Sequence, residues 1–301
     1  MEGSENNGRV FQIVSTESSR DSRISKHILE TPGKRGTFEL GTFTDGESFD
    51  ICVSTMAGCP LKCQFCAIPY SEIPYERRLD ANEMYEQVVL AFQDNGDAKD
   101  IVVGFMGNGE PFLNFDAIVD ASAKILTDPN LPIRALNIST TGIRPQKISE
   151  LADTEFGRSG KGKVQFSLLS LDPAVREEYI PNVKSLQECL PHLDQYAAKT
   201  GQAVKYNVML VDGLNDSLEH AEALAEFIMA APQLRRIKIS TFNPIPGGKI
   251  NPSSEGNFEA FIKCLRQKGV DVKVFRGDTD ESVLASCGQM RARVHQTLTS
   301  K

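Results

Sequence analysis

The length, composition and charge of the chain limit the classes of protein to which it can belong. It has 301 residues, of which 40% are apolar and 24% charged, enough to bury a large core in one α/β domain. A net charge of −7 excludes a protein that coats nucleic acid with a broad basic surface, because phosphate contacts need clustered Lys and Arg. Short basic segments at Arg77–Arg78, Lys161–Lys163 and Arg235–Lys238 are candidates for local basic patches, although scattered surface charge is the favoured interpretation of each. No apolar stretch approaches the ~20 residues of a membrane helix and the first residues do not resemble a signal peptide, so we expect a cytoplasmic protein without membrane contact.

The first fifty residues differ in composition from the rest. Residues 1–9 are rich in Gly, Ser, Asn and Glu, which predicts a disordered tail. Residues 10–49 contain short apolar runs broken by polar and Gly/Pro stretches, which indicates a small β hairpin or meander. We therefore expect a β extension at 10–49 before a catalytic domain at 50–301.

From residue 50 onward, short apolar strands alternate with segments of helical period. This alternation predicts a parallel sheet with covering helices. Asp80 with Glu83, and Asp216 with Glu219, form capping-box patterns that predict helices beginning after Asp80 and Asp216. The predicted strands cover residues 50–54, 100–106, 133–139, 164–169, 203–211, 236–242 and 271–276.

Polar residues recur on one face of the predicted strands. Asp50 and Cys52 alternate with apolar neighbours, and Lys205 and Asn207 do the same in a later strand. If the apolar set meets the helices, the polar set lines the inside of the sheet. An interior this polar is unlike a closed, packed eight-stranded barrel. The prediction is therefore an α/β fold with a partial (β/α)6-type TIM-like barrel, carrying the small N-terminal β extension.

Three of the seven cysteines lie within eight residues, in the segment Cys59-Pro-Leu-Lys-Cys63-Gln-Phe-Cys66 that follows the first barrel strand. This clustering favours one metal centre over a disulfide framework and indicates a reducing compartment. Thiolates suit iron–sulfur clusters or zinc, but a structural zinc wants four protein ligands and no second Cys or His pair follows. Three thiolates leave a [4Fe–4S] cubane with one open iron that can bind S-adenosylmethionine (SAM). The other interpretations are a zinc site or three unrelated cysteines.

Several further motifs occur along the chain in a fixed order. They are Cys52-Val-Ser-Thr-Met-Ala-Gly-Cys59, Phe105-Met-Gly-Asn-Gly-Glu-Pro111, Ile138-Ser-Thr-Thr-Gly142, Val208-Met-Leu, Asn215-Asp216, Phe242-Asn-Pro-Ile-Pro246 and Ser286-Cys-Gly-Gln289. With the cysteine loop, they make the chain resemble the radical SAM superfamily and, more closely, the adenine methyltransferases of the RlmN/Cfr type, from about Glu39 to Met290. The resemblance implies a [4Fe–4S] cluster held by Cys59, Cys63 and Cys66, SAM as a further cofactor, and an electron donor such as flavodoxin or ferredoxin.

The same resemblance implies a set of SAM contacts. Gly109 and Glu110 match the family's Gly-Glu pair, in which the glycine lets the backbone approach and the carboxylate accepts from the methionyl amine. Ser139 matches another SAM contact, and Asn243 matches an active-site asparagine. The stretch Ser167-Leu168-Leu169 stands where the family has Ser-Leu-His, so contacts to the SAM ribose are expected to differ. Taken alone, these residues also fit a tight turn and a strand-end serine cap.

Two cysteines outside the loop are implied to carry covalent chemistry. By resemblance, Cys287 takes a methyl group from SAM and becomes the S-methylcysteine intermediate. Cys52 then resolves the adduct with the adenine by forming a disulfide with Cys287. Glu39 lies thirteen residues before Cys52, as does a substrate-pocket glutamate of the family, and the alternative is an exposed hairpin carboxylate.

The resulting hypothesis is a methyltransferase (EC 2.1.1 type) acting on an sp2 carbon of adenine. The chain has only a short piece where the family carries a helical accessory domain, so the acceptor is expected to be RNA (rRNA or tRNA) or a smaller adenosine-type compound. One alternative is a radical SAM enzyme of another outcome on a small molecule, without methyl transfer. The other is a non-catalytic metal-binding or RNA-binding module.

Overall fold

The computed structural model describes residues 10–44, 48–71, 74–95, 98–245 and 247–276. The predicted tail at 1–9 and Cys287 lie outside the described residues. Within the described part of the chain, no helix is both long and apolar enough to cross a bilayer.

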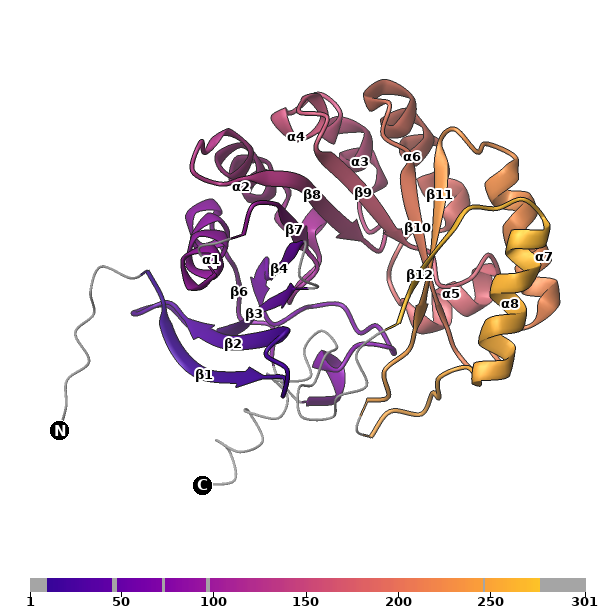
Figure 1. Cartoon of the computed structure of the whole chain (residues 1–301), viewed down its shortest axis with the longest axis horizontal. Helices are drawn as coiled ribbons and strands as arrows, with labels where there is room; N and C mark the ends of the chain where they lie inside the picture. The colour runs from indigo at the N-terminus through magenta and orange to yellow at the C-terminus, as the bar shows by residue number, and fades with distance from the viewer. Residues whose placement is uncertain (1–9, 45–47, 72–73, 96–97, 246, 277–301) are drawn as a thin grey trace.

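A single curved sheet dominates the described part of the molecule (Figure 1). Its order is β1-β2-β3-β4-β7-β8-β9-β10-β11-β12, and β1 and β12 form its two edges. From β4 to β12 neighbouring strands are parallel, so the predicted partial barrel is confirmed. The strands are β1 Gln12–Ser18, β2 Ile24–Glu30, β3 Thr37–Thr44, β4 Phe49–Val53, β7 Ile101–Phe105, β8 Ile133–Thr140, β9 Gly162–Ser167, β10 Val204–Leu210, β11 Arg235–Thr241 and β12 Val272–Phe275.

The N-terminal strands form a meander that continues the barrel sheet. β1, β2 and β3 pair antiparallel in sequence order, and β3 pairs antiparallel with β4. Gly41 of β3 lies opposite Cys52 of β4 in this register. The extension therefore brings its side chains onto the same inner face as the barrel strands.

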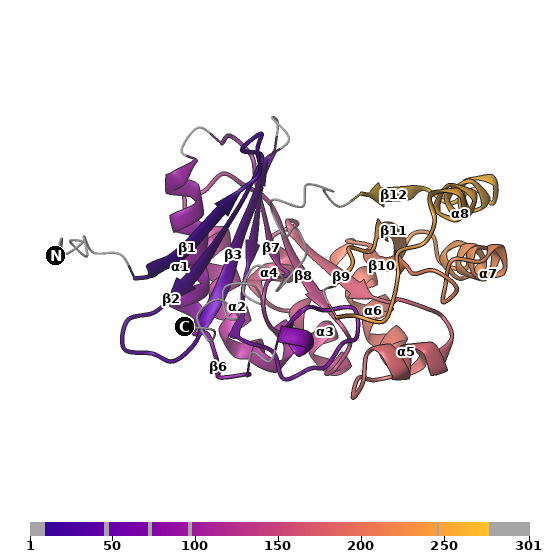
Figure 2. The same ribbon diagram turned by 90° about the horizontal axis from the view of Figure 1, so that it is seen from below.

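Helices follow the parallel strands and cover the outer face of the sheet (Figures 1 and 2). Six strand–helix units precede β12 in the described residues, as expected for a (β/α)6-type barrel. A two-stranded ribbon and two 3-10 turns, η1 and η2, lie in the connections. The bounds are β5 Met56–Ala57, η1 Ile68–Ser71, β6 Arg77–Arg78, α1 Ala81–Asp94, η2 Pro111–Asn114, α2 Phe115–Thr127, α3 Pro145–Leu151, α4 Glu155–Arg158, α5 Pro173–Tyr179, α6 Leu186–Thr200, α7 Leu218–Met229 and α8 Glu255–Gln267.

One of the two predicted helix caps is confirmed and the other is wrong. Asp80 accepts a hydrogen bond from the Glu83 amide, and the Glu83 carboxylate accepts one from the Asp80 amide, both at 2.9 Å. α7, however, is capped by Ser217, whose hydroxyl accepts from the His220 amide at 3.3 Å. Asp216 instead accepts from the Gly213 amide at 3.0 Å and from the Ser253 hydroxyl at 2.6 Å. Asp216 therefore bonds to loop donors, and Ser217, one residue later, occupies the capping position of the helix.

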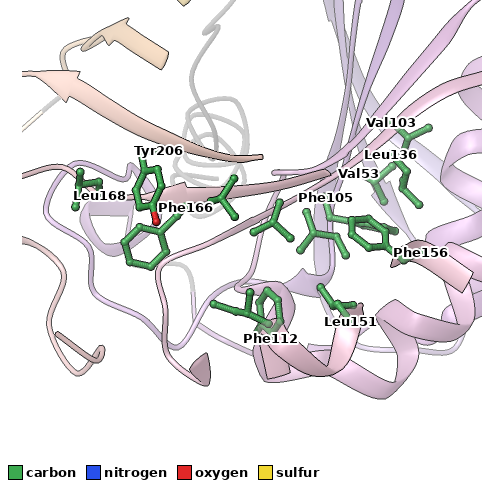
Figure 3. Close-up of a cluster of buried hydrophobic side chains, with 14 of the residues drawn as sticks. Val53, Val103, Phe105, Phe112, Leu136, Leu151, Phe156, Phe166, Leu168 and Tyr206 are labelled. Atoms are coloured by element: carbon green, nitrogen blue, oxygen red, sulfur yellow. The ribbon is translucent and has the colours of Figure 1, made fainter. Parts of the chain in front are cut away.

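The core lies between the sheet and its helices (Figure 3). Val53, Val103, Leu136 and Phe105 point outward from the sheet and are buried against the helix side chains. Along β4 and β10 the burial alternates, with the polar residues half-buried on the other face. The prediction that apolar residues meet the helices and polar residues line the inside is therefore confirmed for these strands.

Candidate active site

Glu110 joins two of the sequence motifs at the carboxyl ends of the strands. It follows β7 and lies fully buried beside the end of β8. One carboxylate oxygen accepts from the Thr140 hydroxyl at 2.6 Å and the Phe112 amide at 3.2 Å. The other accepts from the amide and the hydroxyl of Thr141, both at 2.9 Å. Burial raises the pKa of Glu110, and these donors oppose the rise.

Gly109, next to it, has a conformation that only glycine adopts readily. Its φ is +106°, and a Cβ atom there would lie 2.5 Å from the Thr55 hydroxyl oxygen. The backbone of the Gly-Glu motif is thus pressed against the start of the cysteine loop. The approach of SAM to the Gly109 backbone stays a prediction.

Asn108 connects the same turn to the N-terminal extension. Its side-chain oxygen accepts from the backbone amide of Glu39 at 3.1 Å. The backbone amide of Asn108 donates to the Ser54 hydroxyl at 2.8 Å. The Asn108 side chain is fully buried, and its Nδ2 has no hydrogen-bond partner among the described residues. A buried donor without a partner is costly, so the other contacts of this turn must offset the cost of burying this nitrogen.

Glu39 is 4% exposed, so the alternative of an exposed hairpin carboxylate is wrong. Its Oε2 lies 3.9 Å from Nζ of Lys26 on the neighbouring strand, a side chain that is also buried. The pair faces the inner side of the sheet. Glu39 lies opposite Ile28 of β2 and two residues before Gly41, and Lys26 lies opposite Gly41. Sequence reasoning identified the glutamate but not its lysine partner.

The three loop cysteines share one apolar cluster below the strand ends. Cys63 is buried in it with Leu61 and Leu169, while Cys59 and Cys66 are half-buried against it. Burial raises the pKa of the Cys59 thiol to about 11 and that of Cys63 to about 12, with the charge of Glu110 adding to both. Backbone amides of Leu61 and Gly109 oppose the rise at Cys59.

These thiols fit an iron–sulfur cluster by donor type and position. Across the described residues, no three His, Cys, Asp or Glu side chains are arranged to hold a metal ion, so the thiols are not preassembled as ligands. Bound iron deprotonates its thiol ligands and reverses the effect of burial on their pKa. Three soft donors gathered around one apolar cluster therefore fit an iron–sulfur cluster, provided that the cysteine side chains turn together on binding.

Cys52 occupies an unusually open position on the inner face of β4. Its cross-strand neighbours are glycines on both sides, Gly41 on β3 and Gly104 on β7. The Met106 side chain lies over Gly104, where a Cβ atom would be 2.3 Å from its terminal methyl group. The half-buried thiol therefore faces the inner side of the sheet, beside the flexible Met106 side chain.

Arg176 on α5 holds the neighbouring strand ends together, and sequence reasoning missed it. Its guanidinium donates to the carbonyl oxygens of Ser167 at 2.6 Å, Leu168 at 2.9 Å and Thr141. It also stacks 4.6 Å from the centre of the Phe166 ring. Burial lowers the pKa of Arg176 to about 10. A lone arginine in a helix carries no sequence signal of burial, which explains the omission.

The remaining predicted contacts lie on the inner face or at strand ends. Ser139 accepts from Nε2 of Gln165 at 3.3 Å on the inner face of β8. Leu169 has a φ of +59°, and its carbonyl accepts from Nδ2 of Asn215 at 2.7 Å. Leu168 and Leu169 are buried in apolar clusters, while Ser167 and Asn243 are half-buried. None of these positions replaces the imidazole that the family's Ser-Leu-His stretch would supply.

Comparisons with known proteins agree with this arrangement. The radical SAM superfamily matches residues 53–228. A relative from Chlorobium phaeobacteroides, named "probable dual-specificity RNA methyltransferase RlmN", is 35% identical over 255 residues, covering 80% of this chain and 66% of its own length. One of the same name from Parasynechococcus marenigrum is 30% identical, over 89% of this chain and 77% of its own.

Solved structures show the same fold. A radical SAM methyltransferase from Sphaerobacter thermophilus superposes with a TM-score of 0.82 at 27% identity, covering 94% of this chain and 82% of its own. Spore photoproduct lyase, at 12% identity and a TM-score of 0.56, shares the fold over 75% of this chain and 76% of its own. The chain therefore belongs to the radical SAM superfamily and, within it, to the RlmN family of methyltransferases.

Proposed function

We propose that this radical SAM methyltransferase adds a methyl group to an sp2 carbon of adenine, in RNA or in a smaller adenosine-type substrate. The observation that carries the proposal furthest is the position of Cys52, on the strand that leads into the cysteine loop. Its thiol faces the interior, and its cross-strand neighbours on both sides are glycines. A thiol at this position suits the resolving role that methyl transfer through Cys287 requires.

Cys59, Cys63 and Cys66 would hold the [4Fe–4S] cluster. When bound, the reduced cluster supplies the electron that cleaves SAM, which is the source of both the methyl group and the radical. The chain's own groups bind and orient SAM. Gly109 and Glu110 would receive its amino group, with Ser139, Asn243 and the Ser167–Leu169 turn as further contacts.

Glu110 already accepts four hydrogen bonds, which fill the acceptor sites of a carboxylate. Two of its donors, Thr140 and Thr141, are hydroxyl groups that can rotate away. An ammonium group can therefore replace a hydroxyl donor without breaking the backbone contacts. Because burial raises the pKa of Glu110, a cation beside it would also stabilise the carboxylate form.

Cys287 would accept the methyl group from SAM and carry it to the adenine carbon. Cys52 would then release the product by forming a disulfide with Cys287. Glu39, buried next to Lys26 and held by Asn108, would contact the acceptor base. Its burial makes a hydrogen bond to a base edge stronger than the same contact in water.

The names of the relatives support an RNA acceptor, because they are RNA methyltransferases. The electron donor would be a flavodoxin or ferredoxin. The acidic net charge supports a local contact with the acceptor rather than a wide basic surface.

Peptide mass spectrometry of Cys287 tests the proposal. We expect one added methyl group on the fragment that contains Cys287, in protein purified anaerobically and incubated with SAM. Cys52→Ala should retain this methyl group and accumulate a covalent adduct with the acceptor. Cys264→Ala, a change on outer helix α8, is the matched control and should behave as wild type.

An unmodified Cys287 in protein that still cleaves SAM would contradict methyl transfer. It would favour the alternative of a radical SAM enzyme of another outcome on a small molecule.

A further inference from the structure

Four lysines from four neighbouring strands converge on the inner face of the sheet. Lys163 of β9, Lys205 of β10, Lys238 of β11 and Lys273 of β12 are the inner-face lysines. Lys238 and Lys273 are direct cross-strand partners, and Lys205 pairs with Arg236, two residues before Lys238. All four alternate with residues that point toward the helices. Two of them come from the segments that the sequence suggested were scattered surface charge, and for Lys163 and Lys238 that interpretation is wrong.

This arrangement is electrostatically unfavourable in the protein alone. Like charges directly opposite each other on a sheet are destabilising. Among the described residues, no carboxylate lies within ion-pair distance of Lys163, Lys205 or Lys273. Nζ of Lys238 lies 4.3 Å from the centre of the Phe275 ring, a cation–π contact that places its charge beside β12.

The protonation of Lys205 reflects its surroundings. Burial, together with the charges of Lys273, Lys238 and Lys163, lowers the pKa of Lys205 to about 8. Asp50 of β4 is the acidic group that opposes this effect. Elsewhere on this face the carboxylate of Glu39 is engaged with Lys26. The chain is acidic as a whole, so a cationic cluster inside it is a local feature rather than part of a basic protein.

The cluster lies on the same face as the proposed chemistry. Cys52, Gly104, Asn137 and Lys163 are successive partners in one register row from β4 to β9. Three strand spacings separate the two ends of that row, about 15 Å along the sheet. A ligand with an aromatic base at Cys52 and an anionic group at the lysines would therefore lie along a single surface.

We propose that the inner-face lysines bind the phosphate group of the acceptor nucleotide. The inference rests on the proposed function, since it assumes an adenine acceptor. Lysine ammonium groups bind phosphate as point charges, and several together match its multiple charge. A phosphate would supply the negative charge that Lys163, Lys205 and Lys273 do not receive from an ion pair with the described residues. Free nucleotides and nucleotides within a single strand both present this group.

Lysine acylation of the holoenzyme tests the proposal on the wild-type chain. Protein carrying its cluster and saturated with SAM is treated with an amine-acylating reagent, alone or with adenosine, adenosine 5′-monophosphate or a short adenine-containing oligoribonucleotide. Peptide mass spectrometry then gives the extent of labelling at each lysine. Lys268, an exposed lysine paired with Glu222 on the outer helices, is the internal control.

We expect adenosine 5′-monophosphate to protect Lys205 and Lys238, adenosine to leave them unprotected, and Lys268 to be labelled equally throughout. Protection by the oligoribonucleotide alone would support the same phosphate site and identify a nucleotide within a strand as its source. The proposal would be overturned if neither the monophosphate nor the oligoribonucleotide reduced the labelling of Lys205 and Lys238 below that seen with adenosine.

Equilibrium binding to variants gives a second measure. We expect Lys238→Gln and Lys205→Gln each to weaken binding of adenosine 5′-monophosphate roughly tenfold, the usual effect of losing one charge-assisted contact, without changing the affinity for adenosine. Lys268→Gln should change neither affinity. Unaltered monophosphate binding in the Lys205→Gln/Lys238→Gln double variant would contradict the assignment.

The proposed function can fail independently. Protection of the lysines by the monophosphate in protein whose Cys287 is never methylated would leave the phosphate site standing and remove the methyl-transfer chemistry.

Discussion

The carboxyl ends of the strands and the inner-face lysines solve the problem of buried charge in opposite ways. Glu110 is buried at the strand ends, yet four donors from the chain itself satisfy its carboxylate. Lys205 is only partly buried, yet its charged neighbours on the same face are mainly other lysines. The charge of Glu110 is therefore satisfied within the chain, whereas Lys205 has no ion-pair partner among the described residues.

This difference separates positioning from recognition. A carboxylate fixed by internal hydrogen bonds keeps its geometry before SAM arrives, so little ordering is needed on binding. A cluster of like charges raises the free energy of the unliganded protein. Binding of an anion to the cluster lowers that free energy. Mutations in the two regions should therefore have opposite effects on stability.

The largest effect is expected at the cysteine loop beside Glu110. Cys63→Ala removes one of three thiolate ligands, so we expect iron and sulfide content to fall nearly to zero and SAM cleavage to stop. The apolar pocket around Cys63 accepts Ala, so the protein should remain folded. Metal analysis with circular dichroism checks both statements, and Cys264→Ala serves as the control. A variant that retains its iron would contradict the ligand assignment.

Glu110→Gln should destabilise the strand-end region. Glutamine presents an NH2 group where the carboxylate accepted, and the backbone amide of Phe112 or Thr141 then loses its acceptor. We expect the free energy of unfolding to fall by about 1–3 kcal/mol, because a buried donor is left unpaired. Urea unfolding measures the change. Glu259→Gln on exposed α8 should change it by less than about 0.5 kcal/mol, and equal losses in the two variants would contradict the role of Glu110.

Lys205→Met should stabilise the protein without nucleotide. The pKa of Lys205 is lowered from 10.5 to about 8, so between these values the unfolded chain binds more protons and stability rises with pH. Below pH 8 the wild-type protein therefore carries the full penalty of charging Lys205. We expect the variant to gain about 1–2 kcal/mol at pH 7, allowing for solvent screening, and the gain to disappear as the pH approaches 10.5. Unfolding curves across this range, with Lys268→Met as control, measure it; a gain independent of pH would point to packing instead.

The sequence predicted the framework of the strand-end region because its signals are local. Short apolar runs located the parallel strands, and the cysteine spacing and the Gly-Glu turn each occupy a few adjacent residues. The cap of α7 was misplaced by one residue because the partners of Asp216 include Ser253, which is distant in sequence. Local patterns carry no information about such long-range competition.

The lysine cluster shows the same limit more strongly. Alternation predicted that Lys205 faces inward, but Lys163 and Lys273 lie 110 residues apart in sequence. Only the strand order and register bring them together. Arg176 was missed for a similar reason, since its three carbonyl partners belong to the ends of two other segments.

The smallest predicted effect tests which charges control Lys205. Lys238→Gln removes a neighbouring positive charge and should raise the pKa of Lys205 above about 8, whereas Asp50→Asn removes a negative charge and should lower it below about 8. Both variants leave the burial of Lys205 nearly unchanged, so the direction of each change isolates the contribution of charge. Nuclear magnetic resonance titration of isotope-labelled lysine, with the Lys205 signal assigned by its absence in Lys205→Met, gives both values. Opposite changes that diminish at high salt would show that the inner-face lysines act on one another as a charged cluster. An unchanged pKa in both variants would mean that burial alone sets the protonation of Lys205, and the contrast with Glu110 would then reduce to how each group is shielded from water.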